Sequence, residues 1–407
     1  MKRVVVTGIG ALTPLGNTFD ATWNALLEGK SGVREIDEWR EITGLRSCLA
    51  APIAPFDLPE HYTRKRLRSM GRAAVMAVRA TEMALTDAGL LGAPILSSGE
   101  VGVGYGACLS GTDTLLDIAQ HCLAKDARGM QASAFTQAMS HSCAAGISIF
   151  FGLRGRLIPT SSACTSGSQG LGYAAEAIRS GAQKIMIAGG AEELSIPLLL
   201  LFDSMYATAT TKEGIGATPR PFDAKRDGLV VAEAACSLIL EELSCAQARG
   251  AHIYAELVGF GTNCDGVHIT APTAETMRDV VGLSLRESGL SPRDIGFVHA
   301  HATGTVLGDL TEAQAMVPLF GEGPPFGALK SYFGHTLGAC GALEAALSIR
   351  MMREERFLPV RNLEQVAPEC ESLDIIKEEP RAKSCEFVMC NNFAFGGVNT
   401  SLVFKAI

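Results

Sequence analysis

One cysteine in this chain stands in a setting that could carry chemistry. Cys164 lies within a run of small and polar residues over 160–172, and an alanine-rich segment typical of a helix follows it. A thiol at the start of a helix lies near unpaired backbone N–H groups and the positive end of the helix dipole, which favour the thiolate. Small neighbours also let a substrate approach the sulfur closely. The pattern therefore predicts a nucleophilic cysteine.

Two histidines far along the chain have flanking patterns of their own. His301 begins the run His-Ala-Thr-Gly-Thr, and His335 ends the run Lys-Ser-Tyr-Phe-Gly-His that starts at Lys330. Taken singly, each residue is weak evidence, because the chain has 12 cysteines, 8 histidines and 44 glycines and most such residues are structural. Together, a cysteine and two glycine-flanked histidines indicate acyl-thioester chemistry.

The composition limits the classes of function. The 407 residues exceed what one hydrophobic core usually supports, and 47% hydrophobic against 19% charged residues indicates a globular protein. A net charge of −8 argues against nucleic acid as the main partner. No apolar run reaches the about 18 residues of a membrane span, so we expect none. The opening residues Met1–Val6 predict a buried strand, because the apolar run breaks too early for a signal peptide.

The cysteines form no pair with the spacing C-x-x-C, and no cysteine–histidine spacing is typical of a metal site. We therefore expect reduced thiols, a cytoplasmic location and no bound metal.

Apolar β-branched runs alternate with alanine-rich segments along the chain. This pattern predicts an α/β fold whose strands are buried on both faces. In the N-terminal half it predicts strands at 3–7, 101–104 and 184–188 and helices at 21–27, 73–88 and 170–180.

Weak internal repeats suggest two related halves. The segment Val6–Gly10 resembles Leu257–Gly261, and Cys164 and His335 are each followed by glycines three and six residues later. Coincidence is the alternative, since glycine pairs are frequent in this composition. If the repeat is real, the halves meet near residue 250 and the two following helices pack closely, which would bring Cys164 and His335 together.

These motifs, in this order, resemble those of the β-ketoacyl-acyl-carrier-protein synthases, elongating condensing enzymes of the thiolase-like superfamily. The resemblance extends from Val4–Gly8 to Asn391–Asn399. It implies a thiolase-like fold in which two pseudo-symmetric βαβαβαββ halves form a layered α-β-α-β-α body. The N-terminal half over 1–250 would carry Cys164, and the C-terminal half over 251–407 would carry both histidines and Lys330.

The resemblance also implies a role for each matching residue. Cys164, His301, His335 and Lys330 form the expected catalytic set, and the backbone N–H groups of Cys164 and Phe395 the expected oxyanion hole. The other implied residues are Glu344 as the ion-pair partner of Lys330; Asp309 and Glu312 as supporting acids; Thr270, Thr303 and Thr305 as contacts of the phosphopantetheine arm; and Phe202 and Phe395 as gates of the acyl channel, although core packing would explain either phenylalanine equally well.

The implied reaction is a decarboxylative Claisen condensation of a malonyl-carrier with an acyl group held on Cys164. Neutral imidazoles of His301 and His335 would donate hydrogen bonds to the enolate. No metal or redox cofactor is required, because the acyl carrier protein brings its own phosphopantetheine arm. Phe333, Ala302 and Ala394 depart from the usual pattern and favour an aryl polyene or polyketide pathway over housekeeping fatty-acid synthesis.

A basic stretch over 61–72 is the candidate docking site for the carrier. It contains Arg64, Lys65, Arg66 and Arg68 and no acidic residue, in an otherwise acidic chain. A solvated helix face is the ordinary explanation of such a run. Acyl carriers are strongly acidic, however, and a local basic patch would steer them.

Two alternatives remain for the assembly and the activity. The chain would form a homodimer, or act as the active subunit of a heterodimer with a non-catalytic chain-length factor, since Cys164 is present. A thiolase would need a second reactive cysteine in a C-terminal Cys-x-Gly motif, whereas Cys390 is followed by two asparagines.

Overall fold

Two copies of one βαβαβαββ pattern make up the body of the protein, in a computed structural model that describes residues 1–210 and 214–407. The first copy comprises β1 (Val4–Leu12), α3 (Arg72–Asp87), β4 (Val101–Gly106), α6 (Ser142–Phe151), β5 (Leu157–Thr160), α7 (Ser166–Arg179), β6 (Ile185–Glu192) and β8 (Ala234–Glu242). The second comprises β9 (Ala255–Cys264), α10 (Ala274–Ser288), β10 (Phe297–His299), α11 (Val306–Phe320), β11 (Phe326–Gly327), α13 (Cys340–Arg353), β14 (Phe387–Phe393) and β15 (Val398–Lys405).

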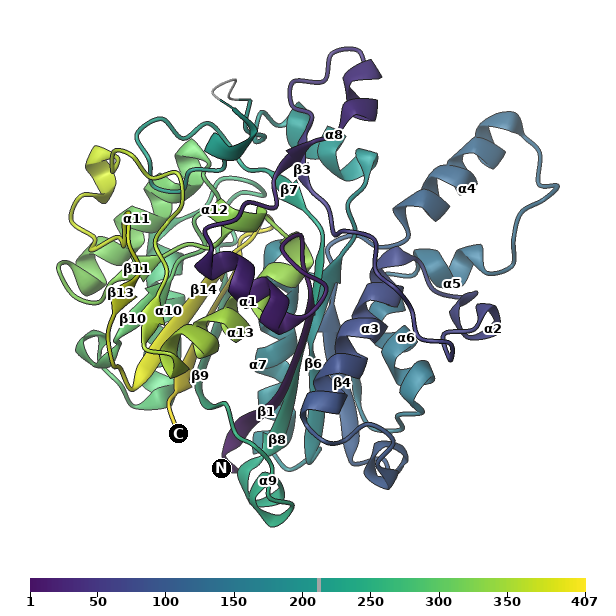
Figure 1. The fold of residues 1–407 in the computed structure, drawn as a ribbon, viewed down its shortest axis with the longest axis horizontal. Helices are drawn as coiled ribbons and strands as arrows, with labels where there is room; N and C mark the ends of the chain where they lie inside the picture. Colours follow the sequence, from purple (N-terminus) through teal and green to yellow (C-terminus); the bar gives the residue numbers. More distant parts are fainter. Residues whose placement is uncertain (211–213) are drawn as a thin grey trace.

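The strands of both copies join in one ten-stranded sheet with the order β11-β10-β14-β15-β9-β1-β8-β6-β4-β5 (Figure 1). Both halves place their strands in the same order. If the five strands of each half are numbered along the chain, their order from the outer edge to the centre is third, second, fourth, fifth and first. The first strands meet antiparallel at the centre, where Val6 pairs with Ala255. The expected α/β fold of two pseudo-symmetric halves is therefore confirmed, and the halves form one continuous body.

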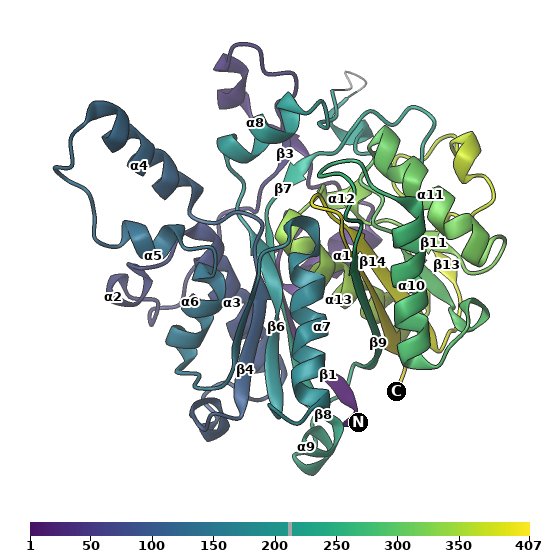
Figure 2. The ribbon, with the colours of Figure 1, turned by 180° about the vertical axis from the view of Figure 1, so that it is seen from behind.

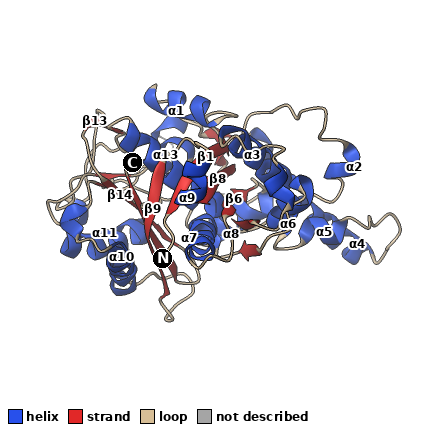
Figure 3. Ribbon diagram, turned by 90° about the horizontal axis from the view of Figure 1, so that it is seen from below, coloured by secondary structure: helices blue, strands red, loops and turns tan. Residues whose placement is uncertain are grey.

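Helices cover the sheet in equivalent ways in the two halves. Helix α3 packs on β1 and β8, as α10 packs on β9 and β15. Helices α7 and α13 contact each other and lie against strands of the sheet. Figure 3 shows the strands running through the middle of the molecule with helices on both sides, and Figure 2 shows α7 and α10 on the rear face. Helix α7 contacts β6 and β15, and α13 contacts β14 and β8, so both helices lie between strands of the two halves, as the middle helical layer of the expected α-β-α-β-α order requires.

The remaining elements decorate this body. They are α1 (Phe19–Leu27), β2 (Arg34–Glu35), β3 (Leu49–Ala51), α2 (Arg64–Leu67), α4 (Thr112–Ala124), α5 (Ala134–Ala138), α8 (Ile196–Ser204), β7 (Val231–Ala232), α9 (Leu243–Ala248), α12 (Lys330–Phe333), β12 (Arg356–Phe357) and β13 (Arg381–Ala382). No described helix is long and apolar enough to cross a membrane.

The strand predicted at 3–7 is longer than expected. It continues through Gly8 to Leu12 because it pairs with β8 along its whole length, with an irregularity between Val6 and Gly8. A Cβ atom at Gly8 would lie 2.3 Å from the Ala84 carbonyl oxygen, so the glycine lets the α3 backbone approach the strand. The glycine that ends the apolar run in the sequence is thus part of the strand.

Close contact between the two halves brings the starts of α7 and α13 together. A Cβ at Gly167 would lie 2.9 Å from the Gly338 carbonyl oxygen, and one at Gly338 would lie 2.6 Å from the Cys108 backbone nitrogen. Larger residues would push these turns apart. Because Cys164 and His335 each precede one of these glycines by three residues, the contact places both side chains at the junction of the halves.

Candidate active site

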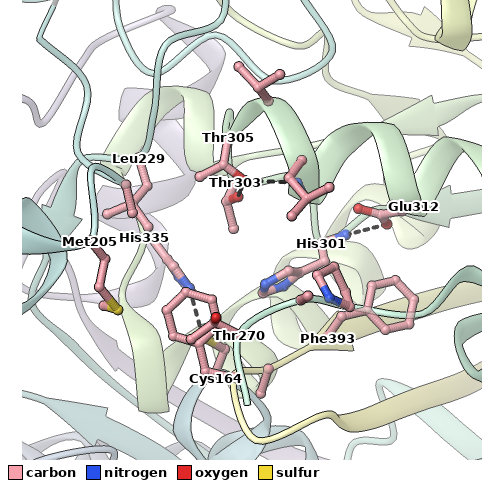
Figure 4. Close-up of a pocket in the computed structure, with 18 of the residues that line it drawn as sticks. Cys164, Met205, Leu229, Thr270, His301, Thr303, Thr305, Glu312, His335 and Phe393 are labelled. Atoms are coloured by element: carbon pink, nitrogen blue, oxygen red, sulfur yellow. Dashed lines mark hydrogen bonds between the residues drawn. The ribbon is translucent and has the colours of Figure 1, made fainter. Parts of the chain in front are cut away.

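A cavity of about 540 Å³ opens at this junction. Among the described residues, Cys164 is the one cysteine on its wall, and His301 and His335 line it as well. Figure 4 shows the cysteine and both imidazole rings directed toward one shared space. The structure therefore brings together the three residues that the sequence predicted to act together.

Cys164 lies in a short 3-10 turn, Ala163–Thr165, directly before α7. The preceding Ala163 has a φ of 50°, a left-handed conformation that an alanine adopts only when its surroundings enforce it. Burial raises the pKa of the Cys164 thiol to about 12, and the Lys330 charge acts in the opposite direction. The helix-start position is as predicted, but burial opposes the thiolate that the sequence suggested.

His335 is held by backbone on both sides. Its N–H donates to the Val230 carbonyl at 2.7 Å, and its carbonyl accepts from Ala232 at 3.0 Å, so β7 fixes its place. Its Nε2 lies 3.0 Å from the Cys164 sulfur. The Leu337 N–H points to its Nδ1 at 3.3 Å. Since Nδ1 accepts, the neutral ring carries its proton on Nε2, toward the sulfur.

His301 follows the carboxyl end of β10 and faces His335, with the ring centroids 5.3 Å apart. Burial and then the charge of Lys330 hold the pKa of both histidines well below the usual range. Both rings are therefore neutral near pH 7, as the sequence required of enolate donors.

The ligand atoms of Cys164, His301 and His335 lie within 4.8 Å of one another, close enough to share a metal ion. A metal would need the Nε2 lone pair of His335, but the Leu337 N–H occupies Nδ1 and leaves the proton on Nε2. The site is therefore arranged for hydrogen-bond donation.

Lys330 lies behind His301 and does not reach the cavity wall. Its fully buried ammonium contacts Glu344 Oε1 at 2.5 Å, the His301 carbonyl at 2.6 Å and His301 Nδ1 at 3.3 Å. Burial is the largest influence and would lower the pKa of Lys330, but the charge and hydrogen bond of Glu344, together with the nearby Cys340 and Glu312, raise the pKa on balance. Lys330 was expected in the catalytic set beside His335. It contacts His301 and does not line the cavity, which favours a positioning role for His301.

The two supporting acids shape the loop that carries His301. Glu312 accepts the backbone N–H groups of His301 at 2.8 Å and Ala302 at 2.7 Å. Asp309 accepts those of Phe222 at 2.8 Å and Gly304 at 3.1 Å. Ala302 has a φ of 29°, which explains why a glycine is common at this position of the motif.

Thr270, Thr303 and Thr305 all line the cavity, where the resemblance places the phosphopantetheine arm (Figure 4). The hydroxyls of Thr303 and Thr305 lie 3.0 Å apart. Thr305 also caps α11 by accepting the Gly308 N–H at 3.2 Å. A capping role and a substrate contact are compatible, because one hydroxyl accepts and donates.

Phe202 and Phe395 line the cavity and stack on each other, with ring centroids 5.9 Å apart. The Phe395 backbone N–H has no acceptor within the described ranges, and the Cys164 N–H acts on its own sulfur. The Phe395 N–H is thus available to a substrate oxygen, whereas the Cys164 N–H interacts with its own sulfur in this structure.

The basic stretch lies elsewhere. Arg64, Lys65, Arg66 and Arg68 are exposed on and beside α2. Arg66 donates to the Phe150 carbonyl at 2.6 Å and stacks over that ring, so α2 rests on α6. Figure 1 shows α2 at the edge of the molecule, away from the helices α8 and α11 that border the cavity.

Sequence patterns missed three buried groups around the site. The Glu192 carboxylate accepts N–H groups from Cys108, Leu109 and Gly338, and so ties the two halves together below the cysteine. Cys340 places its thiol 3.2 Å from the Cys164 carbonyl. Asn392 contacts Glu344 and His301. No motif pointed to Glu192 or Cys340, and Asn392 stood in the matched stretch Asn391–Asn399 without an assigned role, since these roles depend on partners remote in sequence.

Comparison with known proteins covers the whole chain. The family model described as β-ketoacyl synthase, N-terminal domain, matches residues 1–246, and the model of the C-terminal domain matches residues 254–364. A 3-oxoacyl-[acyl-carrier-protein] synthase 2 from Vibrio harveyi is 35% identical over 413 residues, covering 100% of this chain and 99% of that protein.

Solved structures agree. A β-ketoacyl synthase from Burkholderia phymatum STM815 is 48% identical, with a TM-score of 0.98 over 100% of both chains. The ishigamide ketosynthase/chain length factor is 29% identical, with a TM-score of 0.91 over 100% of this chain and 99% of that one. With both family models matched along the chain, this protein belongs to the β-ketoacyl synthase family.

Proposed function

We propose that this protein is a β-ketoacyl-acyl-carrier-protein synthase that condenses malonyl-carrier with an acyl group held on Cys164, in fatty-acid, aryl polyene or polyketide biosynthesis. The observation that carries the proposal is the convergence of a buried thiol and two neutral imidazoles on one cavity. A thioester in this cavity meets a nucleophile and hydrogen-bond donors within reach of the same atoms.

In the first half-reaction the Cys164 sulfur attacks the acyl thioester. The carbonyl oxygen becomes negative and accepts hydrogen bonds from the N–H groups of Cys164 and Phe395; one such donor contributes about 3 kcal/mol. The carrier thiol leaves with the proton of the cysteine, and the acyl group remains as a thioester on the enzyme. The His335 Nε2–H, 3.0 Å from the sulfur, stabilises the thiolate as it forms.

In the second half-reaction malonyl-carrier loses CO2, and the electron pair of the broken bond forms an enolate. The Nε2–H groups of His301 and His335 donate to its oxygen. The enolate carbon attacks the acyl-cysteine, a C–C bond forms and the Cys164 thiolate leaves. The Lys330 charge opposes protonation of either ring, so both keep the neutral form that this step uses.

The two half-reactions can be measured separately. We expect a radiolabelled acyl-carrier to label Cys164 stoichiometrically, and malonyl-carrier to release CO2 only in the presence of the enzyme. Replacement of His301 by alanine should abolish CO2 release and leave labelling of Cys164 within about threefold, because the oxyanion donors are untouched. Labelling without any condensation would overturn the proposal.

The thiolase alternative receives no support from the cysteines. Cys390 lies in β14, where its sulfur is 3.1 Å from the Ser348 hydroxyl, and it does not line the cavity. A cleavage assay with coenzyme A and a β-ketoacyl thioester separates the two activities.

The proposed carrier is an acidic acyl carrier protein, which brings the phosphopantetheine arm as part of its own structure. The exposed cations of α2 are the candidate docking site. Because α2 lies away from the cavity in this chain, we propose that a carrier docked there serves the cavity of a second subunit. We place the reaction in the cytoplasm, where the 12 free thiols of the chain stay reduced.

A second subunit fits the edge of the sheet. The outermost strand β5 has no described partner on one side, and α6, which packs on it, exposes Ile149 at 74%. Helix α5, which contacts α6, exposes Phe135 at 74%, and α4, which contacts α5, exposes Leu123 at 85%. Figure 1 shows α4 and α5 projecting beyond the body at this edge. Unpaired strand edges and exposed apolar side chains favour association.

We propose that two copies of this chain pair through β5, α5 and α6. The heterodimer with a chain-length factor is the second candidate, favoured by the likeness to the ishigamide ketosynthase/chain length factor. Sedimentation of the protein alone distinguishes them: an active dimer supports the homodimer, whereas an inactive monomer supports an obligate partner.

A further inference from the structure

A buried polar cluster lies behind His301, on the side away from the cavity. Its members are Lys330, Glu344 and Asn392, all fully buried, and none of them touches a substrate in the proposed reaction. Buried groups of this kind cost free energy unless each finds a partner. Their partners therefore indicate what the cluster does.

The Nδ1 atom of His301 faces two nitrogen donors. The Lys330 ammonium lies 3.3 Å away and the Asn392 Nδ2 lies 3.5 Å away. An ammonium and an amide NH2 can only donate. A proton on Nδ1 would point at both of them, so the lone pair must occupy this position.

The orientation of the Asn392 amide is itself fixed. Its Nδ2 lies 2.8 Å from Glu344 Oε2, and the opposite orientation would set the amide oxygen against that carboxylate. The NH2 group has two hydrogens, so it can serve Glu344 with one and His301 with the other. The two shorter hydrogen bonds of Lys330 go to Glu344 at 2.5 Å and to the His301 carbonyl at 2.6 Å.

We infer that Asn392 is a positioning residue that holds His301, together with Lys330, in the tautomer whose proton lies on Nε2 and faces the cavity. The consequence for catalysis rests on the proposed function: in the other tautomer His301 would present a lone pair to the enolate, and the hydrogen bond would be lost. His335 needs no such partner, because the Leu337 backbone already selects its tautomer.

Substitution Asn392→Asp tests the inference, because it changes one NH2 to an oxygen of similar size. An ionised carboxylate cannot donate, and a protonated one has a single hydrogen for two acceptors. Either form can accept a hydrogen bond from a proton on His301 Nδ1. Burial and the Lys330 charge keep the ring neutral, so Nε2 loses its hydrogen.

The primary measurement is ¹⁵N NMR of protein with labelled histidine, with the His301 signals assigned by their loss in His301→Gln. We expect Nε2–H and unprotonated Nδ1 in the native protein, and protonated Nδ1 in Asn392→Asp. A protonated Nδ1 in the native protein overturns the inference, and this measurement needs no variant of Asn392 that folds. An Nδ1 that stays unprotonated in Asn392→Asp overturns it as well.

The half-reactions supply the second readout. Decarboxylation of malonyl-carrier should fall about 100-fold in Asn392→Asp, the effect of losing one such donor, while acyl transfer to Cys164 changes less than about threefold. The matched control is Asn391→Asp. Asn391 lies in the same strand, but its amide is directed toward Met316, so the substitution should leave the rates of decarboxylation and of acyl transfer within about threefold of the native values. If Asn392→Asp slows decarboxylation and acyl transfer equally, Asn392 has only a structural role and the inference is refuted. A changed tautomer with undiminished decarboxylation would instead refute the role of His301 in the proposed function.

Discussion

The buried ion pair of Lys330 and Glu344 allows a quantitative test of the site. Both side chains are fully buried and lie 2.5 Å apart, remote from solvent. We expect Lys330→Met and Glu344→Gln each to lower the free energy of unfolding by about 3–5 kcal/mol, because each leaves one charge buried without its partner. Typical domains have only about 5–15 kcal/mol to lose. The double variant removes both charges, so it should regain most of this loss.

The rate of malonyl-carrier decarboxylation should not recover in the double variant, although its stability should. Lys330→Met removes a donor to His301 Nδ1 and a positive charge that, after burial, opposes protonation of both imidazoles. Glu344→Gln in the same chain restores neither. We therefore expect the double variant to fold almost as stably as the native protein and still decarboxylate malonyl-carrier at least about tenfold more slowly, a barrier change of about 1.4 kcal/mol.

The pH dependence of Lys330→Met gives a further check. Burial raises the pKa of Glu344, and the charge of Lys330 opposes that rise, so removing the lysine raises it further. The folded variant then binds a proton that the unfolded chain, with a glutamate pKa of about 4.3, has already released. Its stability should therefore fall as the pH rises from about 5 to 8, relative to the native protein.

Urea unfolding of the four proteins at about pH 5.5 and pH 8 measures these differences, with denaturant slopes compared to verify two-state behaviour. Single variants that cost less than about 1 kcal/mol would refute the reasoning, because that is the size of an exposed pair. A double variant with normal decarboxylation would show that the pair only stabilises the fold.

Three other predictions concern the nucleophile and the carrier. Cys164→Gln should lose condensation yet retain decarboxylation, since its amide mimics the acylated cysteine and both imidazoles remain; loss of CO2 release, measured with labelled malonyl-carrier, would contradict this. Alkylation of Cys164 by iodoacetamide should keep rising with pH beyond neutrality, because burial raises the pKa of the thiol to about 12; a plateau near pH 7 would mean that the helix start outweighs burial. Arg64→Glu with Lys65→Glu should slow turnover of carrier-linked substrate about tenfold, or about 1.4 kcal/mol, in a salt-dependent way, and leave a small thioester unaffected; equal losses on both substrates would refute docking at α2.

The amino-acid pattern predicted the central elements well where apolar residues follow a clear period. The helix expected at 73–88 is α3, Arg72–Asp87, and the strand expected at 184–188 begins at Ile185. The predicted end of the first strand was wrong because a glycine was taken to terminate it, whereas β1 passes through Gly8 and continues to Leu12. The small sheet of β2, β3 and β7 was not predicted, because strands of two or three residues show no periodicity.

The candidate site likewise has residues that local motifs indicate and properties that depend on the whole fold. Cys164, His301 and His335 stand in local motifs, so the sequence alone could point to them as candidates, and the structure places all three on one cavity. The place of Lys330 behind His301 could not be predicted, because it depends on how the turn after β11 packs against β10 and β14. Burial also reverses the expected ionisation of Cys164, and burial is a property of the whole fold.

The repeated fold explains why the candidate site lies at the junction of the two halves. Cys164 follows β5 and His335 follows β11, the equivalent outer strands of the two halves, and each precedes an equivalent helix. The close approach of Gly167 to the Gly338 carbonyl, with the hydrogen bond of Gly338 to Glu192 and that of Cys340 to the Cys164 carbonyl, holds the two turns together. Neither half can form the site alone, because one supplies the nucleophile and the other both imidazoles. The close packing of the halves at Gly167 and Gly338 therefore also sets the distance between the Cys164 sulfur and the His335 imidazole, so a larger residue at either glycine should disturb the packing and the proposed site together.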